Sequence, residues 1–262
     1  MDKSGFKKLM IFSAIAGAII GILQAILNID LLTDHIVLYI VIIVMAVAAA
    51  SIVISFNQWK RPMVLANEGK FKEAIQAFEK LHEKHKGKMG YRDQALSGIA
   101  NMYNRMGEFE KSNSCIEKLN FDRLDNNSKA VNYAIYAYNL YFLNTDLYKA
   151  RGYIKNSREI LELPESILLH ALLQLELEGQ DSSDNIIKQY ESLKFNKKVI
   201  GGFYTVLLID ELFKRVSENF MIGLYYYKIG EEDKAKAYLL EASNCSYESF
   251  FSDTAKHLLK EL

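Results

Sequence analysis

Two long apolar runs open the chain, and amphipathic patterning follows them. The first run, Leu9–Ile29, has no charged residue over 21 positions, and the second, Ile36–Trp59, has none over 24. A helix rises about 1.5 Å per residue, so each run is long enough to cross a hydrocarbon core of about 30 Å. The pattern therefore predicts two transmembrane helices, at about 9–29 and 36–58, joined by a short polar loop.

Basic residues near the ends of the two runs indicate their orientation. Lysines precede the first run and basic residues follow the second, whereas the loop has neither Lys nor Arg: Lys3, Lys7, Lys8, Lys60, Arg61, Lys70 and Lys72. Such residues accumulate on the cytoplasmic side of a membrane. We therefore expect residues 1–59 to form a hairpin in the cell membrane, with an external loop and both chain termini in the cytoplasm.

Small residues recur every four positions along the first run, at Ser13, Gly17, Gly21 and Ala25. This spacing places them on one helix face, where another backbone can approach closely. The face favours packing within the hairpin, and a homo-oligomer remains the alternative. Neither run contains an ionisable residue, which disfavours transport and proton relay.

The pattern changes in residues 60–262 to amphipathic helices joined by short turns. One stretch, 96–119, reads as a helix that Gly107 ends and a second helix that begins at Phe109, because glycine tolerates the left-handed conformation of a helix end. The positions expected to face inward are Leu96, Ile99, Tyr103, Ser112, Ile116 and Leu119. The scarcity of proline and glycine predicts an all-α fold.

Similar helix pairs recur along the chain. A C-terminal copy spans 222–242, and a half-copy spans 68–81, whose first helix is expected near Trp59, interrupted by Pro62. In the C-terminal copy, the positions that correspond to those of the unit 96–119 are Gly223, Tyr226, Gly230, Ala235 and Ala242. In the half-copy they are Gly69, Phe71, Ala74 and Phe78.

Further pairs are more diverged. The pair over 134–157 lacks a turn glycine, and the pair over 167–193 has a polar start to its second helix. Residues 196–216 read as a further helix or pair, and 249–262 as an amphipathic helix that caps the array.

These units resemble the tetratricopeptide repeat, a helix-turn-helix unit of about 34 residues. In the stretch 96–119 the family's small residue, aromatic residue and turn glycine match Ala100, Tyr103 and Gly107, and Ser112 stands where the family has alanine. The resemblance covers 60–262 and implies a cytoplasmic α-solenoid. It also implies an interaction scaffold, in which the first helix of each unit lines a concave groove.

The resemblance also implies which residues line this groove. Asn101 matches the groove-facing asparagine of the family, Asn139 is expected at the corresponding place in the next repeat, and Asn104 and Arg105 lie a turn further along. An amide can donate to and accept from an extended peptide, and arginine can pair with a carboxylate. Alternatively, Asn101 and Asn139 are consensus residues without a ligand.

Other candidate residues have simpler interpretations. The tyrosine-rich stretch could form a recognition surface, but core packing is expected for most of Tyr133, Tyr136, Tyr138, Tyr141, Tyr148 and Tyr153. His82 and His85 are interpreted as part of a solvated face rather than as metal ligands. The basic cluster of Lys84, Lys86 and Lys88 gives the hypothesis of a contact with anionic headgroups.

Composition narrows the possible functions. The chain has 32 basic and 32 acidic residues, and residues 60–262 are also neutral, so nucleic-acid binding is not expected. Cys115 and Cys245 make neither a disulfide framework nor a metal site. No phosphate loop, nucleophile elbow or zinc-protease motif is present, so we expect neither an enzyme nor a cofactor. Plentiful Lys, Ile and Asn suggest a bacterial chain.

The sequence thus favours a membrane-anchored, non-catalytic scaffold that docks a protein or peptide at the cytoplasmic face. One alternative is a regulator that senses a signalling peptide through the same groove. Another is an accessory subunit whose transmembrane helices pack on a partner's spans.

Overall fold

The computed structural model describes residues 45, 58–87, 89–179, 189–190, 211–245 and 249–262. The chain divides after Trp59, and the helices below belong to the second unit, Lys60–Leu262. Apart from residues 45 and 58, both predicted transmembrane helices lie outside the described residues, as does the small-residue face from Ser13 to Ala25. Among the residues that are described, no helix combines the length and the apolar character needed to cross a membrane.

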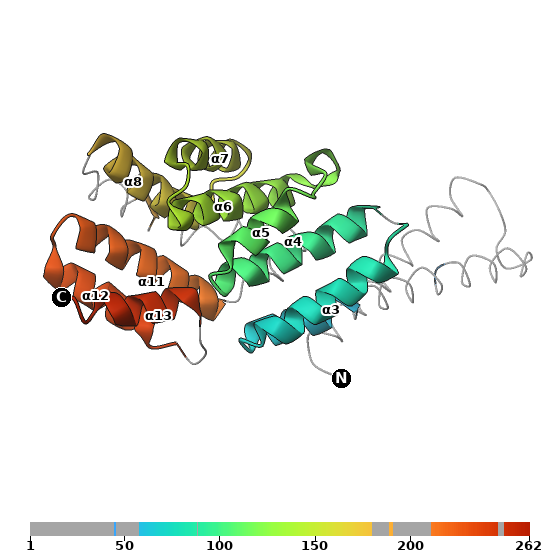
Figure 1. Ribbon diagram of the computed structural model, residues 1–262, viewed down its shortest axis with the longest axis horizontal. Coiled ribbons are helices and arrows are strands. Elements are labelled where there is room, and N and C mark those ends of the chain that lie inside the picture. Colours follow the sequence, from blue (N-terminus) through green and yellow to red (C-terminus); the bar gives the residue numbers. More distant parts are fainter. Residues whose placement is uncertain (1–44, 46–57, 88, 180–188, 191–210, 246–248) are drawn as a thin grey trace, which may run out of the picture. The chain divides into compact units, whose positions relative to one another are not determined.

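The described part of the second unit consists of helices and turns without strands, which confirms the all-α prediction there (Figure 1). In chain order the helices are α3 (Phe71–Lys84), α4 (Met89–Arg105), α5 (Phe109–Ile116), α6 (Asn126–Leu143), α7 (Leu147–Ile160), α8 (Pro164–Glu178), α11 (Glu211–Lys228), α12 (Glu232–Ser243) and α13 (Phe250–Leu258). A 3₁₀ turn at Phe121–Arg123 joins α5 to α6. Successive helices pack on one another, and α4 also packs on α6 and α6 on α8, as in a helical solenoid.

Four of the helix-to-helix turns share one backbone motif. At Gly69, Gly107 and Gly230 the backbone is left-handed, with φ of 73°, 76° and 78°. The amide of the following residue donates to the carbonyl five positions earlier: Lys70 to Leu65, Glu108 to Tyr103 and Glu231 to Tyr226. This is the Schellman motif, which pairs carbonyls that a helix end would otherwise leave unpaired.

The α6–α7 turn has the same motif without glycine. Asn144 adopts φ of 50° there, and the Thr145 amide donates to the Leu140 carbonyl at 3.3 Å. Asparagine is one of the few residues that enters the left-handed region at modest cost. Asp146 then starts α7 by accepting a hydrogen bond from the Lys149 amide at 2.8 Å.

Several helix boundaries differ from the sequence expectation. Residues 58–67 are helical straight through Pro62, so the expected interruption is wrong. Pro62, Met63 and Ala66 are buried, and this apolar contact offsets the single backbone hydrogen bond that proline removes. Helix α6 begins at Asn126, earlier than the predicted 134, because the Asp125 side chain caps it by accepting from the Ser128 amide at 2.9 Å.

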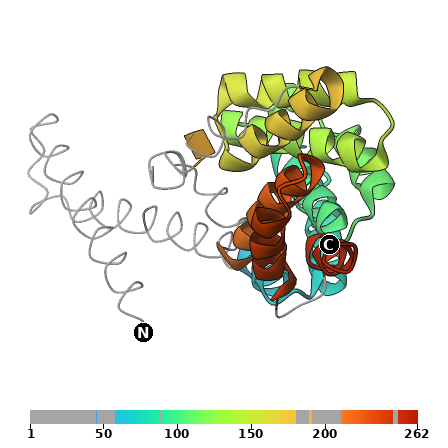
Figure 2. The ribbon, with the colours of Figure 1, turned by 90° about the vertical axis from the view of Figure 1, so that its left-hand side faces the viewer.

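The C-terminal helix α13 forms as predicted, but it does more than cover the end of the array. The centre of the Phe250 ring lies 4.8 Å from that of Phe109 in α5 and 5.1 Å from that of Phe142 in α6. The ring centres of Phe251 and of Phe220 in α11 lie 5.5 Å apart. Figure 2 shows these C-terminal helices, in red, beside the cyan and green helices of the first half. The array therefore curves far enough for its last helix to contact its early ones.

Candidate functional site

The structure places most of the residues expected to line the groove inside the seam between helices. Asn104, Arg105 and Asn139 have 7%, 2% and 0% of their surface exposed, and Asn101 is half-buried. An incoming peptide therefore does not meet the first three on an open surface. Their role in partner binding stays a prediction, and the groove described below does not use them.

These side chains form a polar network across the α4–α6 seam. Asn104 Nδ2 donates to Asn139 Oδ1 at 2.8 Å, and Asn139 Nδ2 donates at 2.8 Å to both Ser112 Oγ and Asn113 Oδ1. Ser112 Oγ in turn donates to the Ala100 carbonyl at 2.8 Å. Arg105 Nε donates to Asn101 Oδ1 of the same helix at 3.2 Å. The network satisfies buried polar atoms and connects three helices.

The expected correspondence between Asn101 and Asn139 is off by one residue. Asn101 lies six positions before the left-handed Gly107, whereas Asn139 lies five positions before the left-handed Asn144. One residue turns a side chain by about 100° around an α-helix, which is enough to move it from an inner face into a seam. Without a glycine in the α6–α7 turn, the sequence had no marker for this register.

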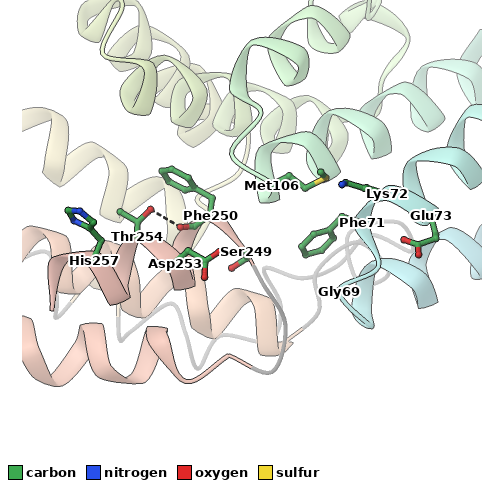
Figure 3. A pocket seen from close by; sticks show the side chains of 10 residues that line it. All are labelled: Gly69, Phe71, Lys72, Glu73, Met106, Ser249, Phe250, Asp253, Thr254 and His257. Carbon is green, nitrogen blue, oxygen red and sulfur yellow. Dashed lines mark hydrogen bonds between the residues drawn. The ribbon is translucent and has the colours of Figure 1, made fainter. Parts of the chain in front are cut away.

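An open groove of about 880 Å³ lies between the start of α3 and helix α13 (Figure 3). The side of α3 contributes Gly69, Phe71, Lys72 and Glu73, α13 contributes Phe250, Asp253, Thr254 and His257, and Met106 and Ser249 complete the lining. In Figure 3 the Phe71 and Phe250 rings stand on opposite sides of this space. Residues separated by about 180 positions thus form one site.

The groove has an apolar floor and a charged rim. Phe71 is buried, with 5% of its surface exposed, and Met106 lies next to it in the lining. On the α13 rim, Asp253 pairs with Lys256 at 3.1 Å and His257 Nδ1 lies 3.2 Å from Glu261. Both contacts are exposed, so they hold the rim only weakly.

The α3 side of the groove carries one lysine and one glutamate, Lys72 and Glu73. Lys72 is exposed and makes no ion pair or hydrogen bond within the described part of the chain, and its amine is directed over the groove toward Met106 (Figure 3). The buried Arg105 guanidinium lies 6.0 Å from the centre of the Phe71 ring. A carboxylate brought beside Phe71 would meet favourable charge from both.

The tyrosine-rich stretch is mainly core, as predicted. Tyr136, Tyr138 and Tyr141 are buried, whereas Tyr148 has 73% of its surface exposed. Burial raises the pKa of Tyr138 well above its ordinary value, and burial together with the neighbouring Glu176 raises that of Tyr141. These hydroxyls stay protonated at neutral pH, as structural groups do.

The remaining candidates show no built site. His82 Nδ1 lies 3.3 Å from the Arg92 carbonyl, and His85 stacks on Tyr91. No group of three potential metal ligands occurs among the described residues. Cys115 and Cys245 are free thiols, and burial raises the pKa of Cys115.

Sequence reasoning missed the groove because its two walls come from opposite ends of the helical unit Lys60–Leu262. Gly69 and Phe71 were recognised only as turn and packing residues, and Phe250 only as part of a terminal helix. Neither segment carries a local sequence motif that marks it as a binding site. Comparison with family models, curated proteins and solved structures finds no match for this chain.

Proposed function

We propose that the chain is a non-catalytic interaction scaffold of tetratricopeptide type, anchored by its N-terminal hairpin at the cytoplasmic face of a membrane. The charge-free runs 9–29 and 36–58 support the anchor. The helix pairs closed by left-handed turns at Gly69, Gly107 and Gly230 support the repeat architecture. Successive left-handed turns at Gly69, Gly107 and Asn144 are 38 and 37 residues apart, somewhat longer than the family's unit of about 34.

The groove between α3 and α13 carries the functional part of the proposal. Its partner is an extended segment that presents an apolar side chain next to an acidic one. The apolar side chain packs on Phe71 and Met106, and the carboxylate pairs with Lys72, the exposed cation of the α3 wall. Apolar burial supplies affinity, and the charge pair supplies direction and selectivity.

A displayed library of random peptides, selected on the purified full chain, tests this proposal. We expect the recovered peptides to share an apolar residue adjacent to Asp or Glu. Lys72→Glu should weaken their binding about tenfold, because an attraction of up to about 1 kcal/mol becomes a repulsion of similar size. Fluorescence anisotropy with one synthetic peptide measures the change.

Lys80→Glu is the matched control, since Lys80 is an exposed lysine of the same helix outside the groove lining. It makes the same change in net charge and should leave peptide affinity unaltered. Peptides that bind both variants equally, or a selection that enriches no common pattern, would refute the groove as the docking site.

A further inference from the structure

A second cavity, of about 390 Å³, is lined by residues of α6, α7, α8, α11 and α13. Among the described residues it shares only Thr254 with the groove that Lys72 borders. Most of its lining is apolar and comes from Phe142, Leu147, Phe220, Leu224 and Leu258. Cavities that hold small molecules have volumes of about 300 to 1,000 Å³, so this one has the size for a small ligand.

Helix α11 gives this cavity a direction. Phe220, Leu224 and Lys228 recur every four residues along one face of the helix, and all three line the cavity. Eight residues of α-helix span about 12 Å, so the lining changes from aromatic to charged over that distance. At the aromatic end the ring centres of Phe142 and Phe220 lie 6.0 Å apart. The charged end lies at Lys228.

An ion pair between two helices forms the charged end. Lys228 Nζ of α11 lies 2.5 Å from Glu176 Oε1 of α8, and the Tyr141 hydroxyl donates to the same oxygen at 3.3 Å. Each charged side chain has 32% of its surface exposed, so a ligand in the cavity can reach both. Within the described part of the chain, Glu176 Oε2 accepts no hydrogen bond, and Lys228 uses one of its three N–H donors. The pair therefore keeps one acceptor and two donors for a ligand.

Neighbouring opposite charges select a ligand that also carries both. A ligand with only a carboxylate is attracted by Lys228 and repelled by Glu176, and a ligand with only an ammonium meets the reverse. A zwitterion meets attraction at both positions, because its ammonium donates to Glu176 Oε2 while its carboxylate accepts from Lys228. The apolar lining then requires an apolar body next to this charged head.

We propose that this cavity binds a free α-amino acid with an aromatic or large aliphatic side chain. The side chain packs between Phe142, Phe220 and Leu224, and the α-ammonium and α-carboxylate pair with Glu176 and Lys228. The bound amino acid bridges α6, α8 and α11, and it stabilises the folded unit because it binds only there. This site needs neither the groove nor its peptide partner.

Isothermal titration calorimetry of the purified full chain with L-phenylalanine tests the proposal. We expect saturable binding with a Kd of about 1 mM or tighter. N-acetyl-L-phenylalanine lacks the ammonium and L-phenylalaninamide lacks the carboxylate, so each should bind at least about tenfold more weakly. L-alanine keeps both charges but leaves the aromatic end empty, and it should lose at least as much affinity.

These compounds also give the results that would overturn the proposal. One is the absence of saturable binding of L-phenylalanine up to about 10 mM. Another is undiminished binding of the N-acetyl compound, which would assign the cavity to the C-terminal residue of a peptide instead. Undiminished binding of the amide would likewise assign it to a peptide N-terminus.

Variants locate the binding in this cavity. Lys228→Met removes the charge but keeps most of the side-chain stem, and it should weaken L-phenylalanine binding at least about tenfold. Lys236→Met is the matched control, because Lys236 is an exposed lysine of α12 that also pairs with a glutamate, Glu232 at 3.8 Å, and lies outside the lining. Equal losses in the two variants, or none in Lys228→Met, would overturn the assignment. Lys72→Glu should leave amino-acid binding unchanged, so a failure of the groove proposal is distinguishable from a failure of this one.

Discussion

At the scale of single residues, the asparagines of the α4–α6 seam show how a family-like residue can take a structural role. Asn139 accepts one hydrogen bond from Asn104 and donates two, to Ser112 and Asn113. Both amide hydrogens and the carbonyl oxygen of its side chain therefore make hydrogen bonds inside the protein. A ligand that engaged Asn139 would first have to break buried hydrogen bonds.

Asn139→Ala should therefore lower the free energy of unfolding by about 1–3 kcal/mol, because it leaves buried partners such as the Asn104 amide unsatisfied. Asn126→Ala, an exposed change in the same helix, should shift it by less than about 0.5 kcal/mol. Urea unfolding followed by circular dichroism measures both. Unchanged stability of Asn139→Ala, together with lost partner binding, would restore the ligand role predicted from sequence.

The sequence predicted which apolar residues are buried, but it did not predict the direction in which individual polar side chains point. The apolar positions Ile99 and Ile116 were expected to face inward, and both are buried. Asn101 and Asn139 were expected to share a face, but one is half-buried beside Arg105 and the other is fully enclosed. An error of one residue in helical register leaves an apolar stripe facing the core, because the stripe is broad. The same error moves a single amide side chain from one helix face to another.

At the scale of elements, the left-handed turns decide where each helix pair folds back. Glycine marked three of these turns in the sequence, and the helix ends at Gly107 and Gly230 were predicted from it. Asn144 carries the same conformation without that mark, so the α6–α7 turn was recognised as a gap in the pattern rather than as a turn of the same kind.

Two of the turn glycines differ in what surrounds them, which gives a matched pair. A Cβ at Gly107 would lie 2.7 Å from Cδ2 of Phe250, whereas a Cβ at Gly230 would meet nothing within 4 Å. Gly230→Ala should cost about 1–2 kcal/mol, from the left-handed backbone alone. Gly107→Ala should cost about 1–3 kcal/mol more, because α13 has to shift.

Thermal unfolding of the two glycine variants measures the difference. Limited proteolysis adds a specific readout, since Gly107→Ala should increase cleavage within α13 and Gly230→Ala should not. If both variants lose the same stability and α13 remains equally protected, the contact between Phe250 and the α4–α5 turn is not part of the folded state.

At the scale of the whole molecule, buried tyrosines link neighbouring helices, and their burial makes the stability of the fold sensitive to alkaline pH. The Tyr138 hydroxyl donates to the Glu165 carbonyl at 3.2 Å, joining α6 to α8, and burial raises its pKa well above the ordinary value. The folded state thus keeps a proton that the unfolded state releases above about pH 10. This stabilisation is fully present below that pH and is lost as the pH rises above it.

Tyr138→Phe should make stability less sensitive to alkaline pH, because the variant has no proton to lose at this position. At neutral pH it should cost about 1 kcal/mol, for the lost hydrogen bond. Tyr148→Phe, at the exposed tyrosine, is the matched control and should leave stability at neutral pH unchanged. Melting temperatures measured between about pH 8 and 11 test this, and parallel curves for all three proteins would contradict it.

The path of the array was the part that local sequence patterns could not supply. Periodicity predicted the helices and glycine predicted most turns, yet nothing near Phe71 or Phe250 indicated that the two would border one space. That proximity depends on small rotations added over every intervening helix pair. Only the assembled unit contains this information.

Helix α13 belongs to the groove and to the packed interior at once. It forms one wall of the groove through Asp253 and Thr254, and it packs on neighbouring helices through Phe250 and Phe251. A segment bound in the groove would favour the docked position of α13, and by thermodynamic reciprocity any change that loosens α13 would weaken binding of the segment. The groove would then exist only while the last helix is docked, so binding there and the folding of the C-terminal end would be one equilibrium.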